Sequence, residues 1–123
     1  MYTKEELAKI KTADEAVKNG FAEFANTDRG ISTGHAGKHY LRKGMQIVRT
    51  HYEFTDENNE IHEGFTWSCM GVPLGALRAL NKVEEQQIKI DDKVYLMAVV
   101  KEDCVIDGVS LGNNRYRYDL VKG

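Results

Sequence analysis

The spacing of apolar and polar positions predicts that the chain begins with helices. Residues 3–6 and 12–15 each have the Thr-x-x-Glu spacing of a capping box, in which a threonine caps a helix and a glutamate bonds back to it. We therefore predict short helices over residues 4–11 and 13–25, with Gly20 as a weak point of the second. The apolar positions of the second helix recur three or four residues apart: Ala13, Ala16, Val17, Phe21 and Phe24. We expect this helical pair to cover a sheet.

From residue 44 the hydrophobic period changes to two, which predicts half-buried strands. Residues 56–59 hold Asp and Asn, which favour a turn, so the segments on either side should form a β-hairpin. Pairing the strands about this turn places Phe54 opposite Ile61 and Val48 opposite Trp67 on one face. The other face then gathers five polar side chains: Arg49, His51, His62, Thr66 and Ser68.

The C-terminal half of the chain predicts one more helix and several strands. Pro73 suits the first turn of a short helix that ends near Asn81. Residues 94–100 are almost continuously apolar, which predicts a central strand buried on both faces. Residues 91–92 and 107–108 have the composition of tight turns. Shorter strands are expected near residues 88–90, 104–106, 109–111 and 116–121.

The order of these elements predicts an α+β fold. Helices do not alternate regularly with strands, which disfavours a doubly wound parallel sheet. We predict a single domain over residues 1–123, with a helical pair in residues 1–26 and a mainly β part in residues 40–123. The β part should be an antiparallel sheet of about five to seven strands with one short inserted helix. It is expected either to form a meander packed against the helices or to curl into a small open barrel.

Composition and termini bear on the compartment. The chain of 123 residues has the size of one domain and contains two cysteines, Cys69 and Cys104, without a Cys-x-x-Cys spacing. The first residues are charged and no apolar segment is long enough to cross a bilayer, so neither a signal peptide nor a membrane partner is expected. We predict a cytoplasmic protein with both thiols reduced and buried.

Charge is distributed unevenly along the chain, although the net charge is only −2. Residues 29–52 contain no Asp or Glu, whereas residues 53–63 contain five. The basic window includes a glycine-rich stretch, residues 27–38, that we expect to be a loop. One interpretation is an anion-binding loop and strand, with backbone N–H groups near the glycines and arginines that fork onto phosphate. The other is a solvated basic face that pairs with the acidic turn.

Recognised catalytic motifs do not fit the sequence. Residues 34–39 resemble a phosphate loop only in part, because Ser32 stands where the first glycine of a Walker motif is required and His39 follows the lysine. His35 and His39 have a metal-ligand spacing, but the glycines around them disfavour a helix. Cys69 falls on the apolar side of its strand, which disfavours a thiol nucleophile. We therefore expect no catalytic residues, no cofactor and no metal.

Residues 115–118 alternate Arg and Tyr near the C-terminus. On a strand, the two arginines share one face and the two tyrosines share the other. Such a strand can hold phosphates and stack bases, and it is equally typical of an edge strand with tyrosines inward and arginines outward. Whether this strand lies near Arg49 decides between one combined basic site and two separate groups.

Two functional hypotheses follow. The first is a non-catalytic binding module for a phosphate-bearing ligand: a nucleotide, a nucleotide-derived signal molecule or a short nucleic acid rather than a long duplex. Its predicted ligand-binding residues are Arg29, Gly34, Gly37, Lys38, Arg42, Lys43, Arg49, Arg115, Tyr116 and Tyr118. The alternative is a small accessory protein, of the type that phages and mobile elements encode, that inhibits or adapts a host protein by protein–protein binding. Either hypothesis is compatible with a homo-oligomer.

Overall fold

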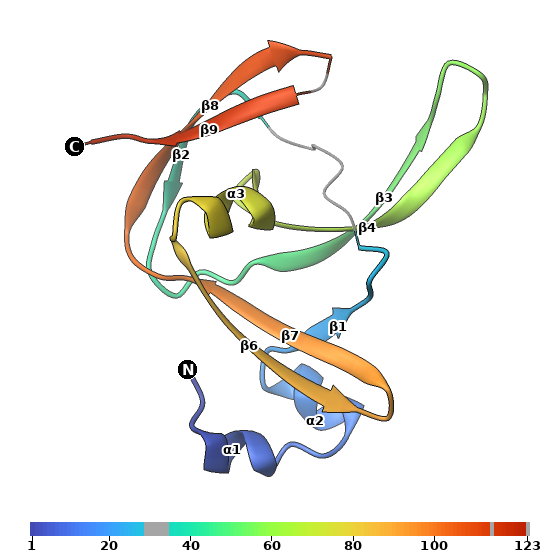
Figure 1. The fold of residues 1–123 in the computed structure, drawn as a ribbon, viewed down its shortest axis with the longest axis vertical. Helices are drawn as coiled ribbons and strands as arrows, with labels where there is room; N and C mark the ends of the chain where they lie inside the picture. Colours follow the sequence, from blue (N-terminus) through green and yellow to red (C-terminus); the bar gives the residue numbers. More distant parts are fainter. Residues whose placement is uncertain (29–34, 114, 123) are drawn as a thin grey trace.

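The computed structural model describes residues 1–28, 35–113 and 115–122. Within these ranges the chain forms three short helices and nine strands, and the strands make three antiparallel sheets of three strands each (Figure 1). None of the sheets formed by the described residues closes into a barrel. The prediction of helices followed by antiparallel strands is confirmed. The prediction of one sheet with five to seven strands is wrong.

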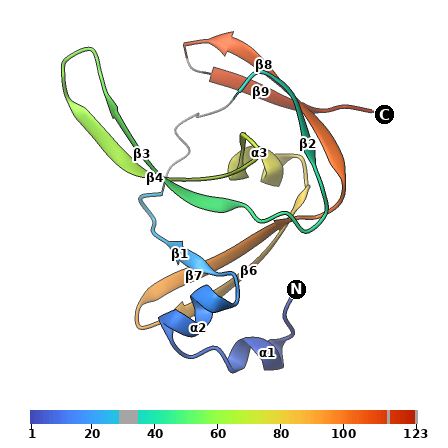
Figure 2. The ribbon, with the colours of Figure 1, turned by 180° about the vertical axis from the view of Figure 1, so that it is seen from behind.

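The first sheet has the order β1-β7-β6, and its central strand is the apolar run predicted from the sequence. It consists of β1 (Ala22–Phe24), β6 (Val83–Ile90) and β7 (Lys93–Val100). The two N-terminal helices, α1 (Lys4–Ala8) and α2 (Ala13–Lys18), lie beside this sheet (Figure 2). Side chains from this helical segment and from the sheet form one hydrophobic cluster: Ala16, Phe21, Ile90, Tyr95 and Met97. The predicted cover of a sheet by the helical pair is therefore confirmed.

Both predicted helix starts are confirmed, but both helices are shorter than predicted, and the first ends at Ala8 instead of residue 11. Thr3 Oγ1 accepts the N–H of Glu6 at 3.1 Å, and the Glu6 carboxylate accepts the N–H of Thr3 at 3.0 Å. Helix α2 ends at Lys18 and not at residue 25, because Gly20 has a φ of +91° and turns the chain into β1. Phe21 and Phe24 therefore enter the interior from a turn and a strand and not from a helix.

The second sheet has the order β2-β8-β9 and contains two corrections. Its strands are β2 (Gly37–Leu41), β8 (Cys104–Gly112) and β9 (Arg115–Leu120), and β2 lies partly in the predicted loop. The predicted turn at residues 107–108 is wrong, because β8 runs straight through it and Gly108 pairs with a neighbour on each side. A Cβ atom at Gly108 would lie 2.5 Å from the backbone carbonyl oxygen of His35, so this glycine permits the close approach of the segment before β2.

The third sheet has the order β3-β4-β5 and leads into the third helix. Its strands are β3 (Val48–Thr55), β4 (Ile61–Cys69) and β5 (Val72–Pro73), followed by α3 (Leu74–Ala79), which confirms the predicted short helix after Pro73. In Figures 1 and 2, α3 lies between the sheets. The largest fully buried side chains come from all three sheets and from α3: Leu41, Val72, Leu77, Leu96, Val100 and Ile106. None of the helices in the described residues is long and apolar enough to cross a membrane.

Candidate functional site: a projecting acidic hairpin

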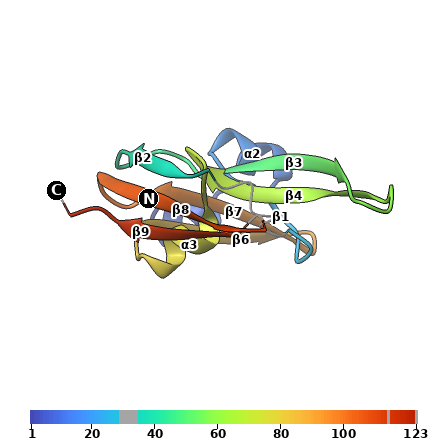
Figure 3. The same cartoon turned by 90° about the horizontal axis from the view of Figure 1, so that it is seen from above.

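The hairpin of β3 and β4 projects away from the other two sheets, with its loop at the far end (Figures 1 and 3). We call residues 48–68 the arm. β3 is an edge strand that pairs with β4 along its whole length and makes its main contacts there. The arm is therefore attached to the rest of the protein through its base and presents its outer part to solvent.

The predicted pairing of the arm is wrong by one residue. Phe54 lies opposite His62, and Arg49 lies opposite Trp67. The cause is the loop, in which the N–H of Asp56 donates to the carbonyl oxygen of Glu60 at 2.9 Å and Asn59 adopts a φ of +60°. Three residues thus lie between the bonded pair Asp56 and Glu60, whereas the predicted pairing of Phe54 with Ile61 would place residue 56 opposite residue 59, with two residues between them. A shift of one residue exchanges the two faces of one strand relative to the other.

The corrected register separates the arm into two chemically different faces. One face, which we call the neutral face, has no Asp, Glu, Lys or Arg: Val48, Thr50, Tyr52 and Phe54 of β3, and His62, Gly64, Thr66 and Ser68 of β4. The opposite face, which we call the charged face, consists of Arg49, His51, Glu53 and Thr55 of β3, and Ile61, Glu63, Phe65 and Trp67 of β4. Arg49 and His51 therefore share a face with Phe65 and Trp67, and not with Thr66 and Ser68 as predicted.

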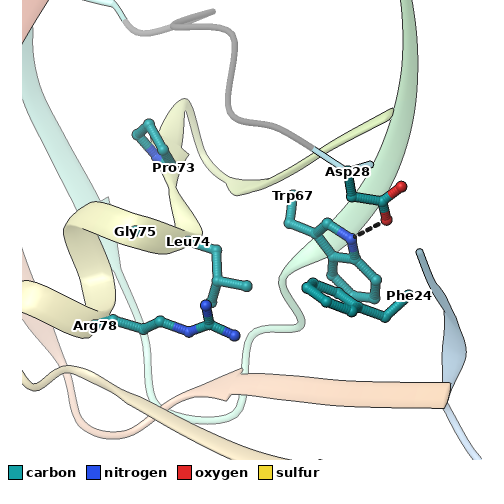
Figure 4. A pocket seen from close by; sticks show the side chains of 7 residues that line it. All are labelled: Phe24, Asp28, Trp67, Pro73, Leu74, Gly75 and Arg78. Atoms are coloured by element: carbon teal, nitrogen blue, oxygen red, sulfur yellow. Dashed lines mark hydrogen bonds between the residues drawn. The ribbon is translucent and has the colours of Figure 1, made fainter. Parts of the chain in front are cut away.

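A buried carboxylate fixes the base of the arm. The Asp28 side chain is 1% exposed and accepts hydrogen bonds from Nε and Nη2 of Arg49, both at 2.9 Å. Nε1 of Trp67 donates to the same carboxylate at 2.8 Å (Figure 4). The Arg49 guanidinium carbon also lies 3.7 Å from the ring centroid of Phe65, in a cation–π contact. Asp28, which follows β1, thus ties the first sheet to both strands of the arm.

The ionisation of Asp28 follows from these contacts. Burial acts to raise the pKa of the Asp28 carboxyl, but the hydrogen bonds from Arg49 and Trp67 and the charge of Arg49 outweigh it. The pKa of Asp28 consequently lies below its ordinary value. The pair is charged at neutral pH, and Arg49 already has a bidentate carboxylate partner.

The structure distributes the predicted phosphate-binding residues over different parts of the molecule. Arg29 and Gly34 lie outside the described residues. Lys38 lies on β2 and Arg115 on β9, which are the opposite edges of one sheet with β8 between them. Gly37 begins β2, Arg42 and Lys43 follow its end, and Arg49 belongs to a different sheet. The described members therefore do not converge on one point, and the basic strand near the C-terminus does not join Arg49.

The C-terminal strand has its tyrosines inward. Tyr116 and Tyr118 alternate with more exposed arginines, and their ring centroids lie 6.4 Å apart. Burial raises the pKa of Tyr118, whose ring also lies near that of His39. Arg117 is bonded to Asp119 at 2.8 Å. This arrangement matches the edge-strand interpretation of residues 115–118 and leaves Tyr118 poorly placed to stack on a ligand.

His39, which has a metal-ligand spacing with His35, contacts the backbone instead. Its Nδ1 lies 2.7 Å from the carbonyl oxygen of Met70, and its Nε2 lies 2.7 Å from the carbonyl oxygen of His35. Carbonyl oxygens only accept, so both contacts are hydrogen bonds when both ring nitrogens carry a proton. His39 thereby connects β2 to the turn between β4 and β5 and has a structural role.

The arm loop contains the one group of side chains in the described part of the chain that could hold a metal ion. Ligand atoms of Asp56, Glu60 and His62 lie within 4.8 Å of one another. Asp56 is already used by the loop, since Oδ1 accepts the N–H groups of Asn58 and Glu60 and Oδ2 lies 2.7 Å from Nε2 of His62. The hydrogen bond from His62 is the main cause that lowers the pKa of Asp56. These contacts account for the cluster as a brace of the turn.

One hollow lies between the arm and α3, and another lies beside β2. A cavity of about 180 Å³ separates the arm base from α3 (Figure 4). The Arg78 side chain on its wall is bonded to Glu85. The lining of the cavity is Phe24, Asp28, Trp67, Pro73, Leu74, Gly75 and Arg78. A more open groove of about 580 Å³ lies along the end of β2 and the start of β8. It is lined by Tyr40, Leu41, Arg42, Asp103, Cys104, Val105 and Val121.

The two cysteines have the environment of core residues. Cys69 is buried and Cys104 is half-buried, and neither forms a disulfide. Burial raises the pKa of both thiols, and for Cys69 the nearby Cys104 adds to the effect. A raised pKa keeps a thiol protonated at neutral pH and lowers its nucleophilicity.

Comparisons with known proteins add no assignment. No protein-family model, no curated protein and no solved structure matches the chain. The geometry of the arm and of the two hollows is therefore the basis for a functional interpretation.

Proposed function

We propose that this protein is a non-catalytic protein-binding module that uses the arm to dock on a partner protein of opposite charge. Three properties of the arm together support this proposal. It projects from the other sheets, it is acidic, and it exposes apolar side chains. This combination corresponds to an adaptor or inhibitor that acts by covering a surface of its partner. The two unpaired cysteines support a cytoplasmic location for this interaction.

The charge distribution supports a basic partner. Residues 52–64 contain five acidic residues and no Lys or Arg, which is a formal charge of −5. The remaining chain has 17 Lys and Arg against 14 Asp and Glu, which is +3. Such a separation of charge steers the arm, and not the rest of the molecule, toward a positive surface.

The apolar content of the arm supports a contact that excludes water. Val48, Phe54 and Ile61 are 52%, 42% and 65% exposed. An isolated two-stranded hairpin is marginally stable in water, but this one is braced at its base by Asp28, Arg49 and Trp67. A braced element loses little conformational entropy on binding, so more of the contact energy appears as affinity.

Site-specific photo-crosslinking tests the proposal. A photo-reactive residue replaces Glu57 in the arm loop or, as a control, Leu111 of β8, which is exposed on a different sheet. We expect position 57, and not position 111, to form a covalent adduct with one protein in cells that produce this chain. The identified protein is then purified and its association rate is measured at low and high salt. Adducts from both positions alike, or none from position 57, would contradict the proposal.

Charge reversal gives the matched kinetic test. Glu57→Lys lies on the arm, and Glu84→Lys on β6 changes the net charge by the same amount at another exposed site. We expect Glu57→Lys to lower the association rate with the purified partner by roughly tenfold at low salt, because the effect of steering depends on where the charge lies. Glu84→Lys should change the rate by less than about twofold. Equal effects would show that only the net charge matters.

Binding of a phosphate-bearing ligand is the second candidate, and the groove beside β2 favours it. The groove places the exposed Tyr40 next to Arg42, so a base could stack on the ring while a phosphate binds the guanidinium. Lys43 adjoins it, and its backbone N–H is bonded to Asp103. Arg49 would have to leave a buried carboxylate to take part, so its predicted role is the least compatible with its contacts.

A thermal-shift screen with nucleotides, cyclic nucleotides and short oligonucleotides tests this candidate. A ligand at 100 times its Kd adds about 2.7 kcal/mol, or several degrees in Tm. The shift should disappear in Arg42→Ala and persist in Arg117→Ala, whose guanidinium is bonded to Asp119. No shift for any compound in the panel would exclude it.

A further inference from the structure

We infer that the neutral face of the arm is the surface that contacts the partner, and that it fits an apolar patch bordered by Lys and Arg. This inference rests on the proposed docking function and specifies which side of the arm is used. It follows from the register of β3 and β4, because the same residues paired one position differently would mix charged and uncharged side chains on both faces.

The neutral face offers a preformed aromatic surface. The rings of Phe54 and His62 stack with centroids 4.9 Å apart, and Tyr52 stacks on Phe54 at 6.4 Å. The Tyr52 ring also lies close to Gly64, where a Cβ atom would be 2.8 Å from the hydroxyl oxygen. Aromatic rings that are already ordered provide contact area at a low entropic cost, and they dominate binding energy at protein interfaces.

The charged face is less suited to burial. Near the base, Arg49 and Trp67 are bonded to Asp28, and Phe65 lies beneath the Arg49 guanidinium. Further out, Glu53 and Glu63 stand directly opposite each other, an unfavourable pair of like charges, and Nε2 of His51 lies 3.6 Å from the Glu63 carboxylate. A partner that covered this pair would have to desolvate two carboxylates.

The position of the acidic groups defines the rim of the partner's surface. Glu53 and Glu63 point to the far side of the ribbon, and Asp56, Glu57 and Glu60 lie in the loop. A partner seated on the neutral face therefore meets the carboxylates at its border and not at its centre. Interfaces commonly have an apolar centre and a polar rim, and here the rim of the partner must be cationic.

Two exposed apolar residues at the tip provide a matched test. Phe54 lies on the neutral face. Ile61 belongs to the next residue pair of the two strands, lies on the charged face and is the more exposed of the two. If buried apolar area alone mattered, Ile61→Ser would weaken binding more than Phe54→Ser. If the neutral face is the contact surface, the order is reversed. Both side chains lie outside the core clusters, so both variants should fold, which circular dichroism checks.

The probe is a random peptide library selected on the immobilised full-length protein. We expect enriched peptides to carry apolar residues flanked by Lys or Arg. Their affinity should fall about tenfold in Phe54→Ser and change less than about twofold in Ile61→Ser, as for a central and a peripheral contact. Equal losses, the opposite order, enrichment of acidic peptides, or light scattering that shows self-association lost in Phe54→Ser would overturn the inference.

A control variant separates this inference from the proposed function. In it, residues 53–63 are replaced by a short Asn-Gly turn, which removes the acidic tip and keeps the base of the arm. If this variant selects the same peptides as the natural chain, or if neither selects any, docking through the arm itself is refuted. If the natural chain alone selects peptides but Phe54→Ser binds them normally, docking stands and the neutral face is the wrong surface.

Discussion

The hairpin of β6 and β7 and the arm have strands of nearly equal length, but they differ in how far those strands are paired and buried. β7 is central in its sheet, with β1 on its other edge, and its side chains contribute to both hydrophobic clusters. Within the described residues β3 pairs only with β4, and most of its side chains are exposed. The first hairpin is part of the core along its length, whereas the second joins the core only at its base, through Trp67, and its outer part is exposed.

The difference between the two hairpins is already present in their hydrophobic patterns. Residues 94–100 are apolar at nearly every position, so both faces of β7 must be covered. β3 alternates, and its apolar side chains Val48 and Phe54 face solvent. Alternation thus identifies a strand with two unlike faces, but it does not establish that the apolar face is covered by the same chain.

The comparison predicts a large difference in the effect of deleting side chains. Leu96→Ala, in β7, removes a side chain that is 0% exposed and should lower the free energy of unfolding by about 2–5 kcal/mol. Val48→Ala, in the arm, should change it by less than about 0.5 kcal/mol. Urea denaturation measures both. A loss of similar size in Val48→Ala would mean that the neutral face is covered in the folded protein.

A substitution at the base of the arm should lower the free energy of unfolding as a core substitution does, and not as one at the tip does. Asp28→Asn removes the charge that pairs with Arg49, and we expect a loss of about 2–3 kcal/mol, because the guanidinium is left mostly buried without a counter-charge. Asp119→Asn is the control, since its partner Arg117 is exposed, and should cost less than about 1 kcal/mol. If the two variants unfold at the same urea concentration, Asp28 does not brace the arm.

The same residue predicts a pH dependence. The pKa of Asp28 is lowered in the folded protein, so its stabilising effect is complete above the ordinary pKa of an unfolded Asp, about 3.9, and is lost as the pH falls through the lower folded value. The difference in unfolding free energy between the natural chain and Asp28→Asn should therefore stay constant from about pH 8 to pH 5 and shrink below about pH 4. Other carboxylates titrate in both proteins, so their contributions to this difference cancel. A difference that grows on acidification would reverse the assigned sign.

Features of the fold that depend on neighbours in sequence could be predicted. The capping box at residues 3–6 needs only four residues, and the turn at residues 91–92 is confirmed by positive φ values of 49° and 65°. The central position of β7 follows from a run of apolar residues that no solvent-facing strand would carry. In each case the determining interaction lies within a short segment.

Features that depend on distant residues could not be predicted. Asp28 and Arg49 are 21 residues apart, and neither has a sequence context that indicates a partner. The prediction of Arg49 as a ligand residue therefore does not take into account a carboxylate in the segment that follows β1. The hairpin register was missed because five loop residues can close in more than one way, and the choice depends on Asn59 adopting a left-handed conformation.

Substituting two glycines should change the free energy of unfolding least, and it compares the arm with the second sheet. At Gly108 a Cβ atom would lie 2.5 Å from the backbone oxygen of His35, so Gly108→Ala must displace main chain and should cost about 1–3 kcal/mol. At Gly64 the nearest atoms belong to the end of the Tyr52 side chain, which can rotate away, so Gly64→Ala should cost less than about 1 kcal/mol.

Gly64→Ala should nevertheless alter the arm locally. Displacing the Tyr52 ring removes its stack on Phe54, and the nuclear magnetic resonance signals of both rings should shift while those of β7 remain in place. Urea denaturation and ring chemical shifts together distinguish a local from a global change. If Gly64→Ala destabilised the protein as much as Gly108→Ala, the neutral face would be part of the folding core, and its assignment as a docking surface would lose its physical basis.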